Sequence, residues 1–555
     1  MPPSAPLATS ADAMLRVFVD NGIDRVFVVP GESYLGVLDA LNDFPEIDVV
    51  TCRHESGAAF MAGVDGRITG HPGVAMVSRG PGATNASIGV HAAQQDGTPL
   101  ILVVGQVPTK DLRREAFQEI DYQQMYGSIA KWVCEVTSPN DLAPAAFKAI
   151  RIATSGVPGP VVLVVPEDVQ QKLVEQPRWI AVREAGTCAD AATLSRIRDL
   201  LSSAKRPLII AGSSFARDGG RDALLSFAET YSLPVTVSFR EHDLFPNDHP
   251  LFVGDLGLSN PEDQLAAFES SDLILALGTR LGDITTQGYT FPRCPRPSQT
   301  LVHCIPDGHF VNQHFAADVG LVADPIAVAR ALAESDASFD RAARTEWVKS
   351  LRAIHERIAA WPTVTAVDGV PFVDVVRALR ERASDDLVLC LDAGTFAAPA
   401  YRHFAYVRQQ RLMASFSGAM GYGTPAAVAS QMRWPHRKVV CMVGDGGFTM
   451  TGNEMIAAVD RNLPILFVLA NNNCYGSIRI HQDREYPGRH LGTTLSNPDF
   501  TAIARAFGME AECVDRVDQI DGAITRGLAA TAPFFIEVQT SFTASLPRGD
   551  APSRE

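Results

Sequence analysis

A glycine-rich segment between two apolar runs restricts the fold of this chain more than any other feature. Residues 444–448 read Gly-Asp-Gly-Gly-Phe and follow the apolar run 439–443. A second apolar run, residues 465–470, ends at three asparagines, residues 471–473. Apolar runs of this length are typical of strands buried on both faces. Because residues 454–459 between them have helical character, the segment predicts a strand, a glycine turn, a helix and a strand, joined as a right-handed βαβ unit.

The two strand ends of this unit predict a site for a metal ion and phosphates. The crossover places Asp445 and Asn472 at the same carboxyl edge of the sheet, where doubly wound sheets bind ligands. A carboxylate, an amide oxygen and the backbone carbonyl of Cys474 are too few to enclose Ca²⁺. They suit a Mg²⁺ ion that takes its other ligands from water and phosphates. A Gly-Asp-Gly sequence alone is more often an ordinary turn, but its spacing to the asparagines favours the functional interpretation.

The composition sets the size and the class of the protein. A chain of 555 residues is long enough for three or four domains, and its 20% charged and 46% hydrophobic residues are ordinary for a globular protein. The net charge of −15, without long acidic runs, argues against nucleic acid as a partner. The nine scattered cysteines form no Cys-x-x-Cys pair, which predicts reduced thiols in a cytoplasmic protein. We find neither a signal-peptide pattern at the start nor an apolar run long enough for a membrane span.

The rhythm of strands and helices continues along the whole chain. Apolar runs that alternate with helical patterns occur at 25–29, 48–52, 73–78, 99–105, 160–165, 207–211, 233–237 and 272–278. This alternation predicts an α/β fold of three doubly wound parallel-sheet domains. We place the domains at residues 1–175, 191–345 and 362–545, with a linker over 175–190. The tail, residues 541–555, is expected to be loose or to act as a mobile cover.

Four further motifs carry a resemblance to a known family. They are Arg-His-Glu at 53–55, Arg-Gly-Pro-Gly-Ala-Thr-Asn at 79–85, Ala-Phe-Gln-Glu-Ile-Asp at 116–121 and Gly-Ala-Met-Gly-Tyr-Gly at 418–423. With the Gly-Asp-Gly segment and its asparagines, the chain resembles thiamine diphosphate-dependent enzymes of the acetolactate synthase type over nearly its whole length. The resemblance implies a pyrimidine-binding domain at 1–175, a middle domain at 191–345 and a diphosphate-binding domain at 362–545.

The resemblance also implies roles for single residues. Glu55 would meet N1′ of the aminopyrimidine and favour the 4′-imino tautomer, whose nitrogen removes the C2 proton of a bent cofactor. Met420 would be the wedge beneath the bend, and the Gly418 carbonyl the partner of the 4′-amino group. Each has a plainer interpretation: Glu55 as a surface carboxylate paired with Arg53 or His54, and Met420 as core packing.

Two larger sets of residues follow from the same resemblance. The cofactor-binding set, besides the residues above, is Gly394, Thr395, Gly444, Asp445, Gly446, Gly447, Asn472, Tyr475 and Gly476, with Asp445, Asn472 and Cys474 as metal ligands. The substrate-pocket set is Phe117, Gln118, Lys131 and His481. Phe117 could equally belong to the core, and Lys131 could be a solvated charge.

The chain departs from the synthases in three places. Arg79 stands where the family has serine, and His481 stands at about the position of a tryptophan that helps choose the acceptor. In the middle domain, residues 304–306 read Cys-Ile-Pro where an acidic residue of the flavin site is expected. Binding of FAD is therefore an open alternative, and Arg280 and Asp324 could hold an adenine nucleotide, a CoA-like group or nothing.

The resemblance implies decarboxylation of a 2-oxo acid with transfer of the enamine to a second carbonyl. Because Glu55 and Asp445 lie on different domains, it also implies a homodimer or homotetramer with the site shared between subunits. The alternatives are a 2-oxo acid decarboxylase, a 2-hydroxyacyl-CoA or hydroxyketone lyase with the same cofactor, and a non-catalytic relative that binds nucleotide in its middle domain. The chain contains no Gly-x-Ser-x-Gly and no Gly-Lys pair, so serine hydrolase and P-loop hypotheses have no support.

Overall fold

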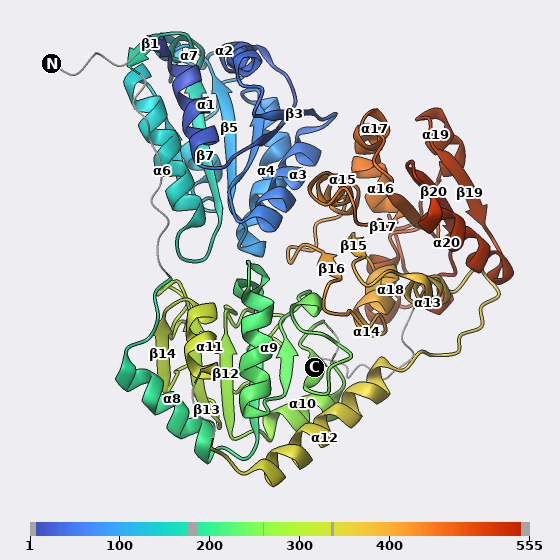
Figure 1. The fold of residues 1–555 in the computed structure, drawn as a ribbon. Helices are drawn as coiled ribbons and strands as arrows, with labels where there is room; N and C mark the ends of the chain where they lie inside the picture. The colour runs from blue at the N-terminus through green and yellow to red at the C-terminus, as the bar shows by residue number, and fades with distance from the viewer. Residues whose placement is uncertain (1–6, 176–185, 259, 335–337, 546–555) are drawn as a thin grey trace.

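Three six-stranded parallel sheets form the framework of the protein (Figure 1). The structure is a computed structural model and describes residues 7–175, 186–258, 260–334 and 338–545. Each predicted domain contains one sheet with helices on both faces, which confirms the α/β fold class with three parallel-sheet domains. The predicted linker lies mostly outside the described residues, as do residues 546–555 of the tail.

The N-terminal sheet has the strand order β3-β2-β4-β5-β7-β6, and a two-stranded antiparallel sheet pairs β1 with β8. The strands of the two sheets are β1 (Leu7–Thr9), β2 (Arg25–Val28), β3 (Asp48–Thr51), β4 (Gly73–Val77), β5 (Leu100–Gln106), β6 (Trp132–Glu135), β7 (Pro160–Pro166) and β8 (Leu173–Glu175). Its helices are α1 (Ser10–Asp20), α2 (Leu35–Ala40), α3 (Glu55–Thr69), α4 (Pro81–Asp96), α5 (Tyr122–Tyr126), α6 (Leu142–Thr154) and α7 (Glu167–Gln170). Alternate residues of β4 point to opposite faces: Ala75 and Val77 pack with α3 and α4, and Val74 and Met76 pack with α1 and α6.

The middle sheet has the order β11-β10-β9-β12-β13-β14. Its strands are β9 (Pro207–Ala211), β10 (Val235–Val237), β11 (Phe252–Asp255), β12 (Leu273–Leu277), β13 (Thr300–Ile305) and β14 (Val319–Val322). Helices α8 (Ala191–Ser203), α9 (Gly220–Tyr231) and α11 (Pro325–Ala333) cover one face, and α10 (Glu262–Glu269) and α12 (Arg341–Ala359) cover the other. The long helix α12 leads from this domain to the C-terminal one (Figure 1).

The C-terminal sheet has the order β16-β15-β17-β18-β20-β19. Its strands are β15 (Val388–Leu391), β16 (Arg411–Met413), β17 (Val439–Gly444), β18 (Leu466–Asn471), β19 (Glu510–Val514) and β20 (Phe534–Gln539). On one face lie α15 (Gly423–Arg433), α16 (Asp445–Thr451), α17 (Met455–Asp460) and α19 (Phe500–Ala506). On the other lie α13 (Phe372–Arg382), α14 (Ala398–Arg402) and α20 (Ile520–Ala529), while α18 (Gly476–Glu485) has no buried residue.

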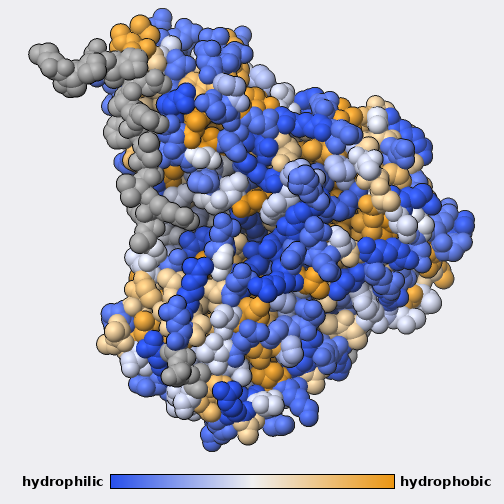
Figure 2. Space-filling model, viewed as in Figure 1, coloured by the Kyte–Doolittle hydropathy of each residue, from blue (hydrophilic) through white to orange (hydrophobic). Residues whose placement is uncertain are grey.

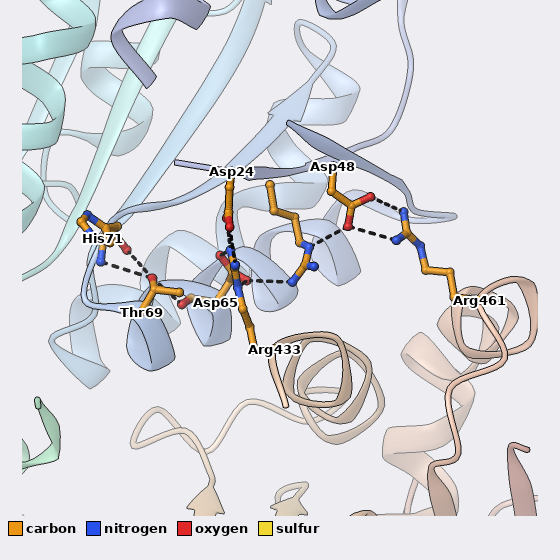
Figure 3. Close-up of polar contacts among 8 residues, drawn as sticks. Asp24, Asp48, Asp65, Thr69, His71, Arg433 and Arg461 are labelled. Carbon is orange, nitrogen blue, oxygen red and sulfur yellow. Dashed lines mark hydrogen bonds and ion pairs between the residues drawn. The ribbon is translucent and has the colours of Figure 1, made fainter. Parts of the chain in front are cut away.

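The N-terminal and C-terminal domains share one apolar core. Residues of α3 and α4 belong to the same buried cluster as residues of α15, α16 and α17, and the rings of Phe60 and Tyr422 meet edge to face at 5.6 Å. Figure 1 shows α3 facing α15 across this contact. Two ion-pair groups flank it: Arg433 contacts Asp24 and Asp65, and Arg461 contacts Asp48 (Figure 3). The two domains of one chain are therefore packed against each other in a defined orientation.

The surface in Figure 2 carries hydrophobic residues in several separate patches among hydrophilic ones. Within the part of the chain that the structure describes, no helix is both long and apolar enough to cross a membrane. All nine cysteines are free thiols.

Two local predictions are wrong. Residues 445–448 were expected as a turn, but they form the first part of helix α16, with Gly444 as its N-cap. Tertiary packing explains this helix, because the space beside Gly446 and Gly447 is filled and only glycine fits there. The start of the tail, residues 541–545, is not loose: Asp368 accepts hydrogen bonds from Ser541, Phe542 and Thr543.

Candidate functional site

Asp445 lies at the carboxyl edge of the C-terminal sheet, as the first residue of α16. Its side chain is buried, with 3% of the residue exposed. The carboxylate accepts a hydrogen bond from the Gly446 N–H at 2.9 Å and one from Asn497 Nδ2 at 2.8 Å. Burial raises the pKa of Asp445, although these bonds and the backbone N–H groups of Asn472 and Asn473 act in the opposite direction. These partners are all neutral, so the buried carboxylate has a hydrogen-bonded setting without a compensating positive charge, and a cation would supply that charge.

Asn472 and Cys474 lie beside Asp445 because β17 and β18 are neighbours, with Gly444 opposite Ala470. The Asn472 Oδ1 atom accepts from the Cys474 backbone N–H at 3.1 Å, so the amide oxygen is held in place. The Cys474 carbonyl accepts from the Gly476 N–H at 2.8 Å and keeps a second lone pair for a metal ion. Because Mg²⁺ prefers oxygen to sulfur ligands, the carbonyl and not the thiol would be the metal ligand of this residue.

The glycines of this edge are required by close contacts. A Cβ on Gly446 would lie 2.5 Å from the Tyr475 ring and 3.1 Å from Met420 Cε, and one on Gly447 would lie 2.7 Å from Asp392 Oδ2. These positions pack α16 tightly against the loops that follow β15, β16 and β18. By contrast, nothing lies within 4 Å of the position of a Cβ on Gly418, which has a positive φ of 66°. Residues 418–423, which contain the predicted wedge Met420 and are called the wedge loop below, are thus open beside Gly418 and packed beside Met420.

Asp392 ties the wedge loop to the edge of the sheet. It accepts from the Gly421 N–H at 3.0 Å and from the Ala393 N–H at 2.6 Å, and burial raises its pKa to about 6. The loop after the same strand also carries Gly394 and Thr395. The Thr395 N–H donates to Ser477 Oγ at 3.1 Å, which joins this loop to the start of α18 beside Gly476. Four neighbouring strand ends therefore bring together every predicted cofactor-binding residue of the C-terminal domain.

A second cluster lies at the carboxyl edge of the N-terminal sheet. Glu55 is the first residue of α3 and is partly exposed. Asn85 Nδ2 donates to its Oε2 atom at 2.9 Å, and a Cβ on Gly82 would lie 3.3 Å from its Oε1 atom. The motif at 79–85 therefore serves Glu55 directly: the asparagine orients the carboxylate and the glycine leaves room for it.

Phe117 and Gln118 lie on the loop beside this cluster. Phe117 is 76% exposed, so it is not a core residue, and its carbonyl accepts from Arg79 Nε at 3.2 Å. Arg79 also pairs with Glu167. Gln118 has a positive φ of 63°, an uncommon conformation for this residue type, and such strain gathers at functional sites. The Glu119 carboxylate stabilises the loop by accepting hydrogen bonds from backbone N–H groups, among them those of Arg114 at 3.3 Å and Ala116 at 3.1 Å.

The structure does not bring Lys131 to this edge. Its backbone N–H donates to the carbonyl of Pro160, the first residue of β7, so Lys131 lies at the amino ends of the strands. Its Nζ atom donates to the carbonyls of Ser155 and, at 2.9 Å, Val157. Lys131 is exposed, which agrees with the alternative of a solvated charge, and its ammonium group also holds this turn. His481 is exposed on α18, with its Nδ1 atom 3.0 Å from Arg484 Nη2.

Within one chain the two clusters lie apart. Asp445 begins α16, and Glu454, which follows the other end of α16 through a short 3₁₀ turn (Gly452–Glu454), contacts the residues just before Glu55. Seven helical residues alone span about 10 Å. Glu55 and Asp445 of one chain are therefore at opposite ends of this segment.

In the middle domain, the residues considered for a nucleotide already have protein partners. Arg280 donates to the carbonyls of Gln94, at 3.2 Å, and Gln95 in the N-terminal domain. Asp324 caps α11 through the Ile326 N–H and pairs with Arg217 at 2.8 Å. Cys304 is buried at the end of β13. These contacts give Arg280 and Asp324 structural roles; a nucleotide at this domain is not supported by them.

Comparison with known proteins identifies the family. The thiamine pyrophosphate enzyme N-terminal TPP binding domain matches residues 8–125, the central domain matches 194–332, and the C-terminal TPP binding domain matches 392–538. The chain belongs to the thiamine pyrophosphate enzyme family. It is 30% identical over 521 residues to the acetolactate synthase isozyme 2 large subunit of Escherichia coli K12, covering 93% of each chain. This chain is an acetolactate synthase-like member of the family.

Two other relatives show how broad the likeness is. A probable acetolactate synthase large subunit of Methanocaldococcus jannaschii is 28% identical over 557 residues, covering 97% of this chain and 93% of the relative. A putative thiamine pyrophosphate-containing protein, YdaP of Bacillus subtilis, is 29% identical over 552 residues with the same coverage. The similarity thus spans all three domains of this thiamine pyrophosphate enzyme.

The residues of this family member fit thiamine diphosphate and Mg²⁺. Asp445, Asn472 and the Cys474 carbonyl lie at one sheet edge, where they would supply three oxygen donors to a metal ion, and the backbone N–H groups at the start of α16 would face the phosphates. The described residues contain no group of three His, Cys, Asp or Glu side chains that could hold a metal ion. A metal at Asp445 would therefore take further ligands from phosphate and water, as Mg²⁺ does.

Several residues that serve this site were missed from the sequence. Asn497 bridges Asp445 and Asn471, Asp392 holds the wedge loop, and Glu454 contacts the segment before Glu55. Asn497 and Glu454 act across long separations in the chain, so no local pattern marks them. Asp392 follows the buried strand β15, and an acidic residue directly after such a strand is a signal that could have been used.

Proposed function

We propose that this protein is a thiamine diphosphate- and Mg²⁺-dependent carboligase that decarboxylates a 2-oxo acid and joins the remaining fragment to a second carbonyl compound. The proposal rests on two groups of residues at the carboxyl edges of two sheets. In the C-terminal domain the buried Asp445 carboxylate lies beside Asn472, and in the N-terminal domain Asn85 orients Glu55. The acetolactate synthases among the relatives support the reaction type.

One set of residues would bind the cofactor and the metal, and another would hold the proton at the pyrimidine. Asp445, Asn472 and the Cys474 carbonyl would hold Mg²⁺, and the loops at Gly394 and α16 would hold the diphosphate. Bound thiamine diphosphate supplies an acidic carbon that adds to a keto group and accepts the electron pair released with CO₂. Glu55 would hold a proton at N1′ of the pyrimidine, and Asn85 fixes the carboxylate for that task. Met420 and Gly418 would shape the cofactor between the two.

The site would be shared between two subunits. Glu55 and Asp445 of one chain lie at opposite ends of the α16 segment, so Glu55 would serve a cofactor held by Asp445 of the partner subunit. This arrangement supports a homodimer or a homotetramer. The free cysteines support a reducing, cytoplasmic location.

The substrate would meet residues of both edges. Phe117 and Gln118 lie on the loop at the Glu55 edge, and His481 lies on α18 beside the predicted diphosphate site. Because histidine replaces a tryptophan of the synthases at about this position, we expect acceptor choice to differ from theirs. Lys131 stays outside the proposed pocket, because it lies at the opposite edge of its sheet.

Product analysis tests the reaction type. With thiamine diphosphate, Mg²⁺ and a panel of 2-oxo acids, we expect CO₂ release and a new carbon–carbon bond, which mass spectrometry of the product detects. Release of a free aldehyde as the main product would favour a decarboxylase instead. Binding of the cofactor without CO₂ release from any 2-oxo acid would shift the chemistry to cleavage of a 2-hydroxyacyl-CoA or hydroxyketone.

Mixing of two inactive variants tests the shared site. Glu55→Gln and Asp445→Asn each disable one half of every site in their own oligomer. Refolded mixtures should regain about a quarter of wild-type activity, because half of the dimers are mixed and each of these has one intact site. Separately refolded variants combined afterwards are the control. No recovery, with mixed dimers demonstrated by mass spectrometry, would show that both residues must come from one chain.

A further inference from the structure

Glu454 is a buried carboxylate that the reaction just described does not use. It has no exposed surface, and it lies where the C-terminal domain meets the N-terminal domain. Its Oε1 atom accepts the His54 N–H at 2.8 Å and the Arg53 N–H at 3.0 Å, and its Oε2 atom lies 3.3 Å from the same Arg53 nitrogen. These two N–H groups belong to the residues directly before Glu55.

Gly57 makes room for this contact. A Cβ at position 57 would lie 2.6 Å from Glu454 Oε1 and 2.7 Å from its Cδ and Cγ atoms. Glycine inside a helix lowers helix stability relative to alanine, yet Gly57 lies in the first turn of α3. The glycine at 57 and the carboxylate at 454 therefore fit one another across the domain boundary.

The contact acts on the backbone that aims Glu55. His54 is the N-cap of α3, and its ring Nδ1 accepts from the Ser56 N–H at 3.2 Å. Glu454 accepts the N–H groups of Arg53 and His54, so the backbone that leads into α3 is held by the His54 ring on one side and by Glu454 on the other. Burial raises the pKa of Glu454 to about 7, and the charges that act on it are Arg53, which lowers the pKa, and Glu55, which raises it. A buried acceptor with two donors is costly to disrupt.

We propose that Glu454 is a positioning residue for Glu55: through the Arg53 and His54 N–H groups, the C-terminal domain sets the orientation of the proton-holding carboxylate of its own chain. The inference rests on the proposed function. It assigns the role to hydrogen-bond acceptance by Oε1 and not to the negative charge. The residue touches neither substrate nor cofactor in this account and acts only through Glu55.

Position and charge can be separated by the choice of variant. Glu454→Gln keeps an oxygen that accepts both N–H groups and removes the charge, whereas Glu454→Ala removes both. Gly57→Ala displaces the carboxylate from the other side of the same contact. Arg461→Gln is the matched control, because Arg461 pairs with Asp48 at 2.8 Å across the same domain boundary (Figure 3). Its hydrogen bonds go to Asp48 and to the Val49 carbonyl.

The first readout needs no cofactor. Amide hydrogen exchange, followed by mass spectrometry of a peptide that starts at least two residues before Arg53, such as residues 50–57, reports the protection of the Arg53 and His54 N–H groups. We expect faster exchange in Glu454→Ala and Gly57→Ala, and wild-type protection in Glu454→Gln and Arg461→Gln. Unchanged protection in Glu454→Ala would overturn the inference.

The second readout is the rate at which bound thiamine diphosphate exchanges its C2 proton, measured by NMR after acid quench, beside the cofactor dissociation constant. Glu454→Ala and Gly57→Ala should slow this exchange by on the order of 100-fold with cofactor affinity retained, and the double variant should be no slower than either. Glu454→Gln should restore the rate. Two results would overturn the inference and leave the proposed function standing. One is C2 proton exchange at the wild-type rate in Glu454→Ala, and the other is exchange as slow in Glu454→Gln as in Glu454→Ala. No acceleration by the wild-type protein would instead overturn the proposed function and the inference with it.

Discussion

The Glu55→Gln variant is expected to lose activity by about 10²- to 10⁴-fold, the range that a positioned acid–base group contributes. The amide keeps the size of the side chain, and its oxygen can accept the Asn85 Nδ2–H bond that now measures 2.9 Å to Oε2. It cannot hold a proton at N1′. The loss should appear in kcat, with little change in the affinity for thiamine diphosphate, because in the proposed site the diphosphate and the metal would be held at the Asp445 edge. Steady-state kinetics with cofactor titration checks both quantities.

Glu46→Gln is a suitable control for this result, because Glu46 is an exposed carboxylate before strand β3, at the opposite edge of the same sheet. Its activity should stay far closer to wild type than that of Glu55→Gln. Full activity of Glu55→Gln would contradict the proton-holding role of this residue.

The Asp445→Asn variant is expected to bind thiamine diphosphate at least about 100-fold more weakly in the presence of Mg²⁺, since outer partners of metal ligands alone are worth about 10- to 100-fold. Without cofactor the variant should be at least as stable as the wild type, because a neutral amide replaces a buried carboxylate whose pKa is raised by burial. Loss of cofactor affinity together with retained or increased thermal stability is the expected signature. Titration calorimetry and thermal unfolding measure the two effects.

Asp499→Asn provides the comparison for that variant, because Asp499 is a nearby N-cap carboxylate of α19 with no role in the site. It should leave cofactor affinity unchanged. If Asp445→Asn bound the cofactor as tightly as the wild type does, Asp445 would not be a metal ligand.

Much of the fold follows from short-range patterns. Central apolar runs, such as 439–443, became buried strands, because a strand covered by helices on both faces has few polar positions; the run at 48–52 became the edge strand β3, in which only Val50 is buried. The helix at Asp445 could not be predicted in this way. Two of its first three residues are glycines, which disfavour helices locally, and only packing against Tyr475 and Asp392 explains them.

In the candidate site, too, local patterns predicted some residues, and others became apparent only from the packing of the domains. Motifs at strand ends predicted the residues that gather around Asp445, since parallel strands bring their carboxyl ends together. Lys131 shows the limit of this reasoning: a residue carried over by position alone lies at the other edge of its sheet. Glu454 and Arg53 are 401 residues apart in the chain, and only the packing of two domains reveals that they touch.

The most direct measurement of the central claim is calorimetric titration of the cofactor-free protein with thiamine diphosphate, once with Mg²⁺ and once with a chelator. We expect saturable binding of one cofactor per chain with Mg²⁺ and much weaker binding without it, because in the proposed site Asp445 and Asn472 would reach the diphosphate through the metal. Absence of binding, or equal binding in the chelator, would contradict the account at its base.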